Sequence, residues 1–194
     1  MRQFFILAIS MLALSSCNSK SDSSDHASKS SDKLNKLLSN DILTKDRIEN
    51  ENDSTLEELI FSNLYVNIKV DPKSTDEDYK NQFKKFTVPQ QIFYSTLTLE
   101  RNVKHFGFKG YFEHNQSVGQ FAVYALNGYK ELGLPEVSIT VSKAIDMNKS
   151  DLKLSDSSFY KLDTILLRQI VEQNSSKERL KLIHNNIDSF ITRR

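Results

Sequence analysis

The sequence contains a single cysteine, Cys17, and only one long apolar run, which lies at the N-terminus. One cysteine leaves no second thiol for an intramolecular disulfide, so the fold must be held by its core alone. The apolar run, residues 4–14, is too short to cross a hydrocarbon core of roughly 30 Å as a helix. The sequence therefore predicts neither an internal disulfide nor a transmembrane helix.

Common catalytic motifs are also missing. The sequence has no Gly-x-Ser-x-Gly, no His-Glu-x-x-His, no phosphate-binding loop and no Gly-x-Gly-x-x-Gly. An excess of one charge sign is absent too, because residues 54–194 carry nineteen Lys and Arg against seventeen Asp and Glu, a net +2. Both signs are interspersed along the chain. We therefore expect no nucleic-acid partner.

The N-terminus has the order of parts found in an export signal. Arg2 precedes the apolar run, and Leu14-Ser15-Ser16-Cys17 ends it with small residues before the cysteine. These last four residues resemble the lipobox of bacterial lipoproteins, in which the signal is cut before the cysteine and the sulfur is acylated. The resemblance implies a signal peptide over residues 1–16, lipid attachment at Cys17 and anchoring to a membrane of the cell envelope. An incidental thiol in an ordinary signal peptide is the alternative.

A change of composition follows Cys17. Residues 18–32 hold seven serines, with charged residues between them and almost nothing apolar. Such a segment buries too little surface to offset its ordering entropy, so we expect a flexible tether over residues 17–53. The remaining residues, 54–194, are of normal size for one domain.

The periodicity of residues 54–194 predicts an all-α domain of antiparallel neighbouring helices. A capping box at Ser54 and Glu57 is expected to open the first helix. A run rich in β-branched and aromatic residues, 94–99, leaves a strand open as the alternative there. The other expected helices cover residues 76–86, 89–106, 117–132, 135–147, 157–172 and 177–193.

Two glycines are expected to end helices. Gly107 and Gly133 each follow an apolar helical stretch and are free to take a positive φ, and Pro135 then starts the next helix. The basic side chains Lys177, Arg179 and Lys181 could contact anionic lipid or a partner, and a solvated helix face explains them equally well.

The stretch 103–115 holds two glycines and four aromatics and is the candidate binding surface. We expect five of its side chains to border a protein partner, because aromatic side chains are enriched at recognition surfaces. These five side chains are His105, Phe108, Tyr111, Phe112 and His114. Burial of all three rings, those of Phe108, Tyr111 and Phe112, would count heavily against this expectation. We expect no metal or other cofactor, although a site built from His105, Glu113 and His114 is geometrically conceivable.

A family resemblance involves the same stretch. Gly107, Phe108, Tyr111 and Phe112 resemble the helix-corner motif of a family of small helical bacterial proteins, whose best-known member is a DNA mimic that binds a transcription factor. Leu132-Gly133-Leu134 and Lys143-Ala144 resemble its later motifs. The resemblance covers residues 89–190 and implies the fold and the helix order. DNA mimicry needs an acidic surface, and this domain is close to neutral, so that activity is not carried over.

The resulting functional hypothesis is a membrane-anchored envelope lipoprotein whose helical domain is a non-catalytic protein-binding module. Two alternatives stay open. One is an envelope hydrolase or metal-dependent enzyme that uses His105, Glu113 and His114. The other is a protective protein that neutralises a secreted toxin.

Overall fold

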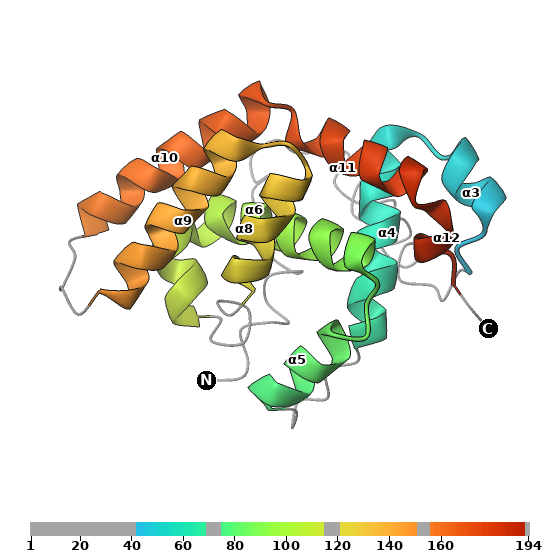
Figure 1. Ribbon diagram of the computed structural model, residues 1–194, viewed down its shortest axis with the longest axis horizontal. Coiled ribbons are helices and arrows are strands. Elements are labelled where there is room, and N and C mark those ends of the chain that lie inside the picture. Colours follow the sequence, from blue (N-terminus) through green and yellow to red (C-terminus); the bar gives the residue numbers. More distant parts are fainter. Residues whose placement is uncertain (1–41, 69–74, 115–120, 151–155, 193–194) are drawn as a thin grey trace, which may run out of the picture.

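The structure is a computed structural model that describes residues 42–68, 75–114, 121–150 and 156–192, with backbone only at Asp76, His114, Asp156 and Ser157. The predicted signal peptide, Cys17 and the tether up to residue 41 lie outside these residues. Within the described ranges every regular element is a helix, and the helices form one domain (Figure 1). The predicted all-α class is therefore confirmed. The elements are α3 (Lys45–Asn50), α4 (Asp53–Ile68), α5 (Asp76–Phe83), α6 (Val88–His114), α8 (Ala122–Glu131), α9 (Pro135–Lys149), α10 (Asp156–Glu172), α11 (Ser175–Asn185) and α12 (Ile187–Phe190).

Helix α6 is the central element. It runs through the middle of the domain, and α4, α8, α9, α10, α11 and α12 all pack against it (Figure 1). Every residue from Phe93 to Glu100 is buried, on all sides of the helix. This burial explains why residues 94–99 have the composition of a strand, because a fully buried segment is apolar and β-branched in either conformation. The strand alternative for 94–99 is wrong.

Gly133 ends α8 as predicted. Its φ is 73°, its N–H donates to the carbonyl of Lys130 at 3.0 Å, and the N–H of Leu134 donates to the carbonyl of Tyr129 at 2.8 Å. This pair of bonds is the Schellman motif, which satisfies carbonyls that a helix end leaves free. Pro135 then begins α9. Proline has no backbone N–H, which costs nothing at the first position of a helix, where the N–H would have no partner within the helix. The chain reverses here and places α9 beside α8.

The start of α4 differs from the expectation. Asn52, not Ser54, caps the helix: its side-chain oxygen accepts the N–H of Thr55 at 3.0 Å. Glu57 points away from the helix start to Ser176 and Arg179. The predicted capping box at Ser54 and Glu57 is therefore wrong, because a tertiary ion pair holds the glutamate.

The packed part of the chain begins before residue 54. Ile48 of α3 is fully buried and Leu43 is 1% exposed. The N–H of Leu43 donates to the side-chain oxygen of Thr192 at 3.1 Å, and the N–H of Thr192 donates to the carbonyl of Leu43 at 3.0 Å. The sequence predicts a tether up to residue 53, but Leu43 and helix α3 contact the C-terminal end of the domain.

The expected C-terminal helix 177–193 is two helices. Helix α11 ends at Asn185, and Asn186, with φ −136° and ψ 37°, separates it from α12. At the other end, Asn174 takes a left-handed conformation, φ 50°, and its side chain accepts the N–H of Lys177. Asparagine tolerates this conformation better than most residues, which lets the chain turn sharply between α10 and α11.

None of the described helices is long and apolar enough to cross a membrane.

Candidate functional site

A kink in α6 builds the first candidate site. Gly107 has φ 66° and ψ 173°, so the helix is interrupted there and resumes at Phe108. The N–H of Phe108 donates to the Asp163 carboxylate of α10 at 2.7 Å. A Cβ atom added to Gly107 would lie 2.6 Å from the other oxygen of Asp163. Asp163 therefore caps the second part of α6 from a neighbouring helix, and only glycine fits beneath it. The predicted helix stop at Gly107 is confirmed as a kink.

Burial shifts the acidity of this cap. It raises the pKa of the Asp163 carboxyl, and the hydrogen bond from Phe108 lowers it by less, so the pKa lies above the usual value.

Two of the predicted binding residues belong to the core. Phe108 and Tyr111 are fully buried. Phe112 is half-buried, with its ring stacked on Phe108 and tilted against Phe159 of α10. After the kink, Phe108, Tyr111 and Phe112 lie on one face of the helix, because residues at i, i+3 and i+4 share a face, and Phe112 contacts α10 there through Phe159. The expectation that Phe108 and Tyr111 border a partner is wrong.

The residues just before the kink are exposed. Lys104 and His105 are exposed, and Phe106 keeps 53% of its surface accessible. We call residues 104–107 the α6 corner. Of the predicted surface, His105 is exposed and Phe112 keeps part of its surface accessible, and Phe106 joins them. The side chain of His114 lies outside the described residues. Sequence reasoning missed Phe106 because helical periodicity assigned it to the apolar stripe.

The part of the chain described by the structure contains no group of three His, Cys, Asp or Glu side chains that could hold a metal ion. Glu113 is exposed and pairs with Lys109, one turn earlier on the same helix, at 3.8 Å. The alternative built on His105, Glu113 and His114 stays a prediction, because it needs the side chain of His114.

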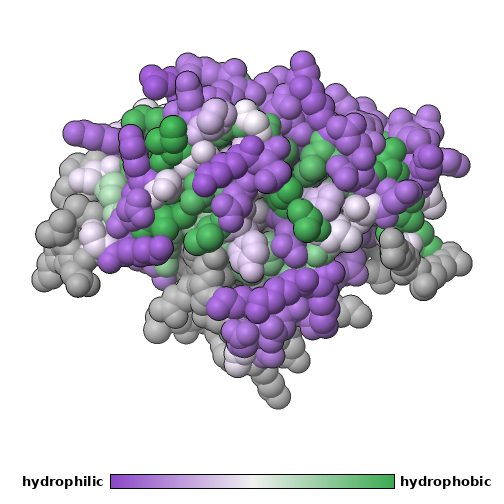
Figure 2. All heavy atoms as spheres, viewed as in Figure 1, coloured by the Kyte–Doolittle hydropathy of each residue, from purple (hydrophilic) through white to green (hydrophobic). Residues whose placement is uncertain are grey.

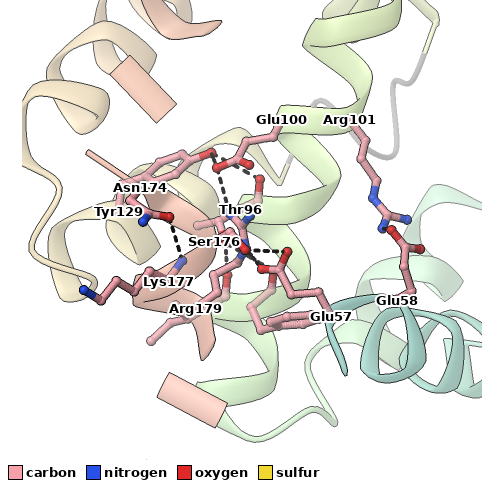
Figure 3. A network of polar contacts seen from close by, with 12 residues as sticks. Glu57, Glu58, Thr96, Glu100, Arg101, Tyr129, Asn174, Ser176, Lys177 and Arg179 are labelled. Atoms are coloured by element: carbon pink, nitrogen blue, oxygen red, sulfur yellow. Dashed lines mark hydrogen bonds and ion pairs between the residues drawn. The ribbon is translucent and has the colours of Figure 1, made fainter. Parts of the chain in front are cut away.

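A second cluster of polar side chains is buried where α4, α6, α8 and α11 meet (Figure 3). Arg179 of α11 is 2% exposed. Its Nε donates to Glu57 at 2.7 Å, and its Nη1 donates to Glu100 at 2.7 Å. Tyr129 donates to the same oxygen of Glu100 at 3.2 Å and to the carbonyl of Thr96 at 3.1 Å.

The pKa values of Arg179 and Tyr129 are both raised, but burial opposes the rise at Arg179 and is its largest cause at Tyr129. Burial lowers the pKa of the Arg179 guanidinium, but Glu100 and Glu57 raise it by more, so Arg179 stays charged. Burial and the Glu100 carboxylate raise the pKa of Tyr129 well above its usual value, so its hydroxyl stays protonated. Both donors are already directed at carboxylates of the chain itself. The cluster therefore joins four helices and offers no free nucleophile or base.

Sequence reasoning placed two members of this cluster wrongly. The sequence predicts Arg179 at the surface with Lys177 and Lys181, and Glu57 in a helix cap. Both lie on the apolar side of their helices: Arg179 is four residues before Ile183, and Glu57 lies beside Leu56 and three before Ile60. A charged residue that falls on an apolar stripe is the signal that identifies such a buried pair.

An open groove of 190 Å³ lies between α9 and α10. Thr140 and Gln169 are hydrogen-bonded across it at 2.8 Å, and Gln173 donates to Glu136 at 2.8 Å at one end. Figure 2 shows patches of hydrophobic surface over these two helices, surrounded by hydrophilic side chains. The apolar lining comes from Ile139, Leu162 and Ile165, and Lys143 lines the groove as well.

Comparison with known proteins gives one family match. Residues 84–188 match the family described as DMP19-like protein, which covers α6 to α11 and thus both the corner and most of the buried cluster. No curated protein and no solved structure matches the chain at a significant level. The matched segment is more than half of the sequence, and it includes the helix-corner residues that carried the resemblance. The chain belongs to the DMP19-like protein family.

Proposed function

We propose that this protein is a bacterial envelope lipoprotein, anchored through Cys17, whose helical domain acts as a non-catalytic protein-interaction module. The anchor is supported by Leu14-Ser15-Ser16-Cys17 at the end of a short apolar run. The non-catalytic role is supported by the buried cluster, whose donors are satisfied within the chain. The near-neutral charge of residues 54–194 favours a protein partner over nucleic acid.

The observation that carries the interaction role is the α6 corner. Phe106 is half exposed beside the exposed ring of His105, with 6.1 Å between the ring centroids. Aromatic side chains at interfaces bury a large area and dominate binding energy. The corner is also fixed in place, because Asp163 holds the first N–H after the kink. A rigid aromatic side chain loses little entropy on binding, which favours affinity.

The anchor is tested by acylation in the cell. The full chain is expressed in a bacterial host fed an alkyne analogue of palmitate, and labelling is followed by gel fluorescence. We expect labelled protein in the membrane fraction and no label on Cys17→Ser. Equal labelling of the two chains, or none on either, would show that Cys17 is not an acylated anchor.

The interaction role is tested by capture from envelope extracts. Tagged wild-type protein is compared with Phe106→Ala and with the control Val88→Ala, which alters a side chain 67% exposed at the other end of α6. We expect Phe106→Ala to lose a captured protein that Val88→Ala retains, with unchanged circular dichroism in both. Capture that is identical for all three proteins would remove the corner from the binding surface, and no reproducible partner would end the proposal.

A further inference from the structure

Helix α9 exposes a short stripe of side chains along the groove. Glu136, Ile139 and Lys143 follow one another at spacings of three and four residues, so they lie on one face. All three are exposed, and Ile139 keeps 53% of its surface accessible. An isolated exposed isoleucine needs no explanation. This one lines a groove whose apolar lining also includes Leu162 and Ile165.

The stripe has a negative side chain at one end and a positive side chain at the other, so two antiparallel copies of it would place opposite charges together. Glu136 and Lys143 are seven residues apart, about 10 Å along the helix axis, with Ile139 close to their midpoint. Glu136 is held in the groove by Gln173, which bonds one carboxylate oxygen. Lys143 has no carboxylate partner among the described residues. In an antiparallel pairing of two α9 helices, each Glu136 would lie opposite the Lys143 of the other copy.

We propose that the α9–α10 groove is a self-association surface, in which a second copy of this chain packs its α9 antiparallel on the first. The two-fold axis passes between Ile139 and Thr140. Such an interface is isologous, so a single contact between residues 136 and 143 occurs twice. Each Ile139 leaves water and packs on the apolar groove of the other copy.

The occupant of the groove is a second copy of this chain and not a helix of another protein, because α9 itself carries the complementary charges in the required order. Exposed ion pairs add little strength individually and mainly determine register and orientation. The contact is of the small, reversible class, since one helix of fifteen residues is about 22 Å long. The proposal requires neither the lipid anchor nor a partner at the α6 corner.

The first test is a disulfide across the axis. The full chain with Cys17→Ser, which removes the native thiol, receives Ile139→Cys, or the control Val123→Cys at a side chain 47% exposed on α8. Both proteins are purified reduced and then oxidised, and covalent dimers are measured on non-reducing gels. We expect a dimer from Ile139→Cys in large excess over the control. Equal dimer in both proteins, or none in Ile139→Cys, would overturn the proposal and leave the groove to another occupant.

The second test reverses charges in the Ile139→Cys protein. Glu136→Lys alone places two lysines opposite each other at both ends of the interface, so the dimer yield should fall several-fold. Adding Lys143→Glu restores opposite charges and should restore the yield. A double variant that stays as low as the single one would contradict the antiparallel register, and a single variant that dimerises like its parent would contradict it as well.

Discussion

Arg179 illustrates what a single buried charge does in this fold. It is among the largest fully buried side chains of the described residues, and it is held by one carboxylate from α4 and one from α6. Desolvation of three charges is costly, so such a cluster adds less net stability than its short distances suggest. Its removal is costly for the same reason, because the partners then lie buried without compensation.

Replacement of Arg179 by methionine should therefore be severe. Glu57 and Glu100, whose side chains are 14% and 10% exposed, would lose their counter-charge. We expect the free energy of unfolding to fall by about 3–5 kcal/mol. Urea unfolding followed by circular dichroism measures it.

Arg101→Met is the matched control for that change. Arg101 pairs with Glu58 on the surface and lies over the ring of Phe61 at 4.0 Å. Its loss should cost about 1 kcal/mol or less. Similar losses for Arg179→Met and Arg101→Met would show that the buried cluster has no special role.

Gly107 supports a second prediction at the residue scale. Alanine there meets two penalties, the positive φ of 66° and the Asp163 oxygen 2.6 Å from the new Cβ. At Gly133, with φ 73°, alanine meets only the first, because nothing lies within 4 Å. We expect Gly133→Ala to lower the free energy of unfolding by about 1–2 kcal/mol and Gly107→Ala by more. Thermal unfolding of the two variants compares them, and a larger loss for Gly133→Ala would contradict the cap from Asp163.

At the scale of the elements, α5 is attached to α6 by tyrosine. The hydroxyl groups of Tyr79 and Tyr94 are hydrogen-bonded at 2.8 Å, and Phe83 of α5 packs its ring on Phe121 at 4.4 Å. Burial raises the pKa of Tyr79 from 10.0 to about 12, although the bond to Tyr94 lowers it. The packing of α5 is therefore sensitive to alkaline pH.

The direction of this sensitivity follows from the pKa shift. The folded state holds the Tyr79 proton more tightly than the unfolded state, so the contribution of Tyr79 to stability is complete below pH 10.0 and is lost as the pH rises through about 12. Tyr79→Phe lacks this titration. The stability difference between wild type and Tyr79→Phe, measured by urea unfolding at increasing pH, should narrow over that interval. A stability difference between the two proteins that stays constant with pH would show that Tyr79 is not the group responsible.

The sequence of this chain was sufficient to predict where helices form, but it did not show which side of each helix contacts another helix. The periods that identified α9 and α10 are local properties of the sequence, as is the glycine that ends α8. The side of a helix that another helix covers is a tertiary property. Phe108 and Tyr111 have the sequence pattern of surface aromatics, because nothing in the local sequence indicates that the packed helices bury them. Glu57 lies three residues after Ser54, which is the spacing of a capping box. Only the folded structure, in which Glu57 lies 2.7 Å from Arg179, shows that its partner is a different one.

At the scale of the whole molecule, the boundary of the packed chain matters most. The DMP19-like match begins at residue 84, yet α3 and α4 are packed with it and supply buried residues such as Ile48, Leu56 and Ile60. The N-terminal helices therefore belong to the same hydrophobic core. An expressed fragment that begins at residue 54 would lack part of it.

Ile48→Ala tests that boundary. The side chain is fully buried on a helix of six residues, so its truncation should lower the free energy of unfolding by about 2–5 kcal/mol. The control is Ile42→Ala, at a side chain 36% exposed, which should cost far less. Differential scanning calorimetry of both variants decides it. If both variants unfolded at nearly the wild-type temperature, α3 would not be part of the hydrophobic core.

The pair of hydrogen bonds between Leu43 and Thr192 joins the first and last parts of the described chain. Helices α3 and α12 contact each other at the same end of the domain, so the two ends of the described chain lie side by side (Figure 1). The two ends therefore cannot fray separately, because opening one of them removes the hydrogen-bonding partner of the other. A force applied to the chain before residue 42 would therefore act first on the two hydrogen bonds between Leu43 and Thr192, which would have to break before the packed helices were loaded.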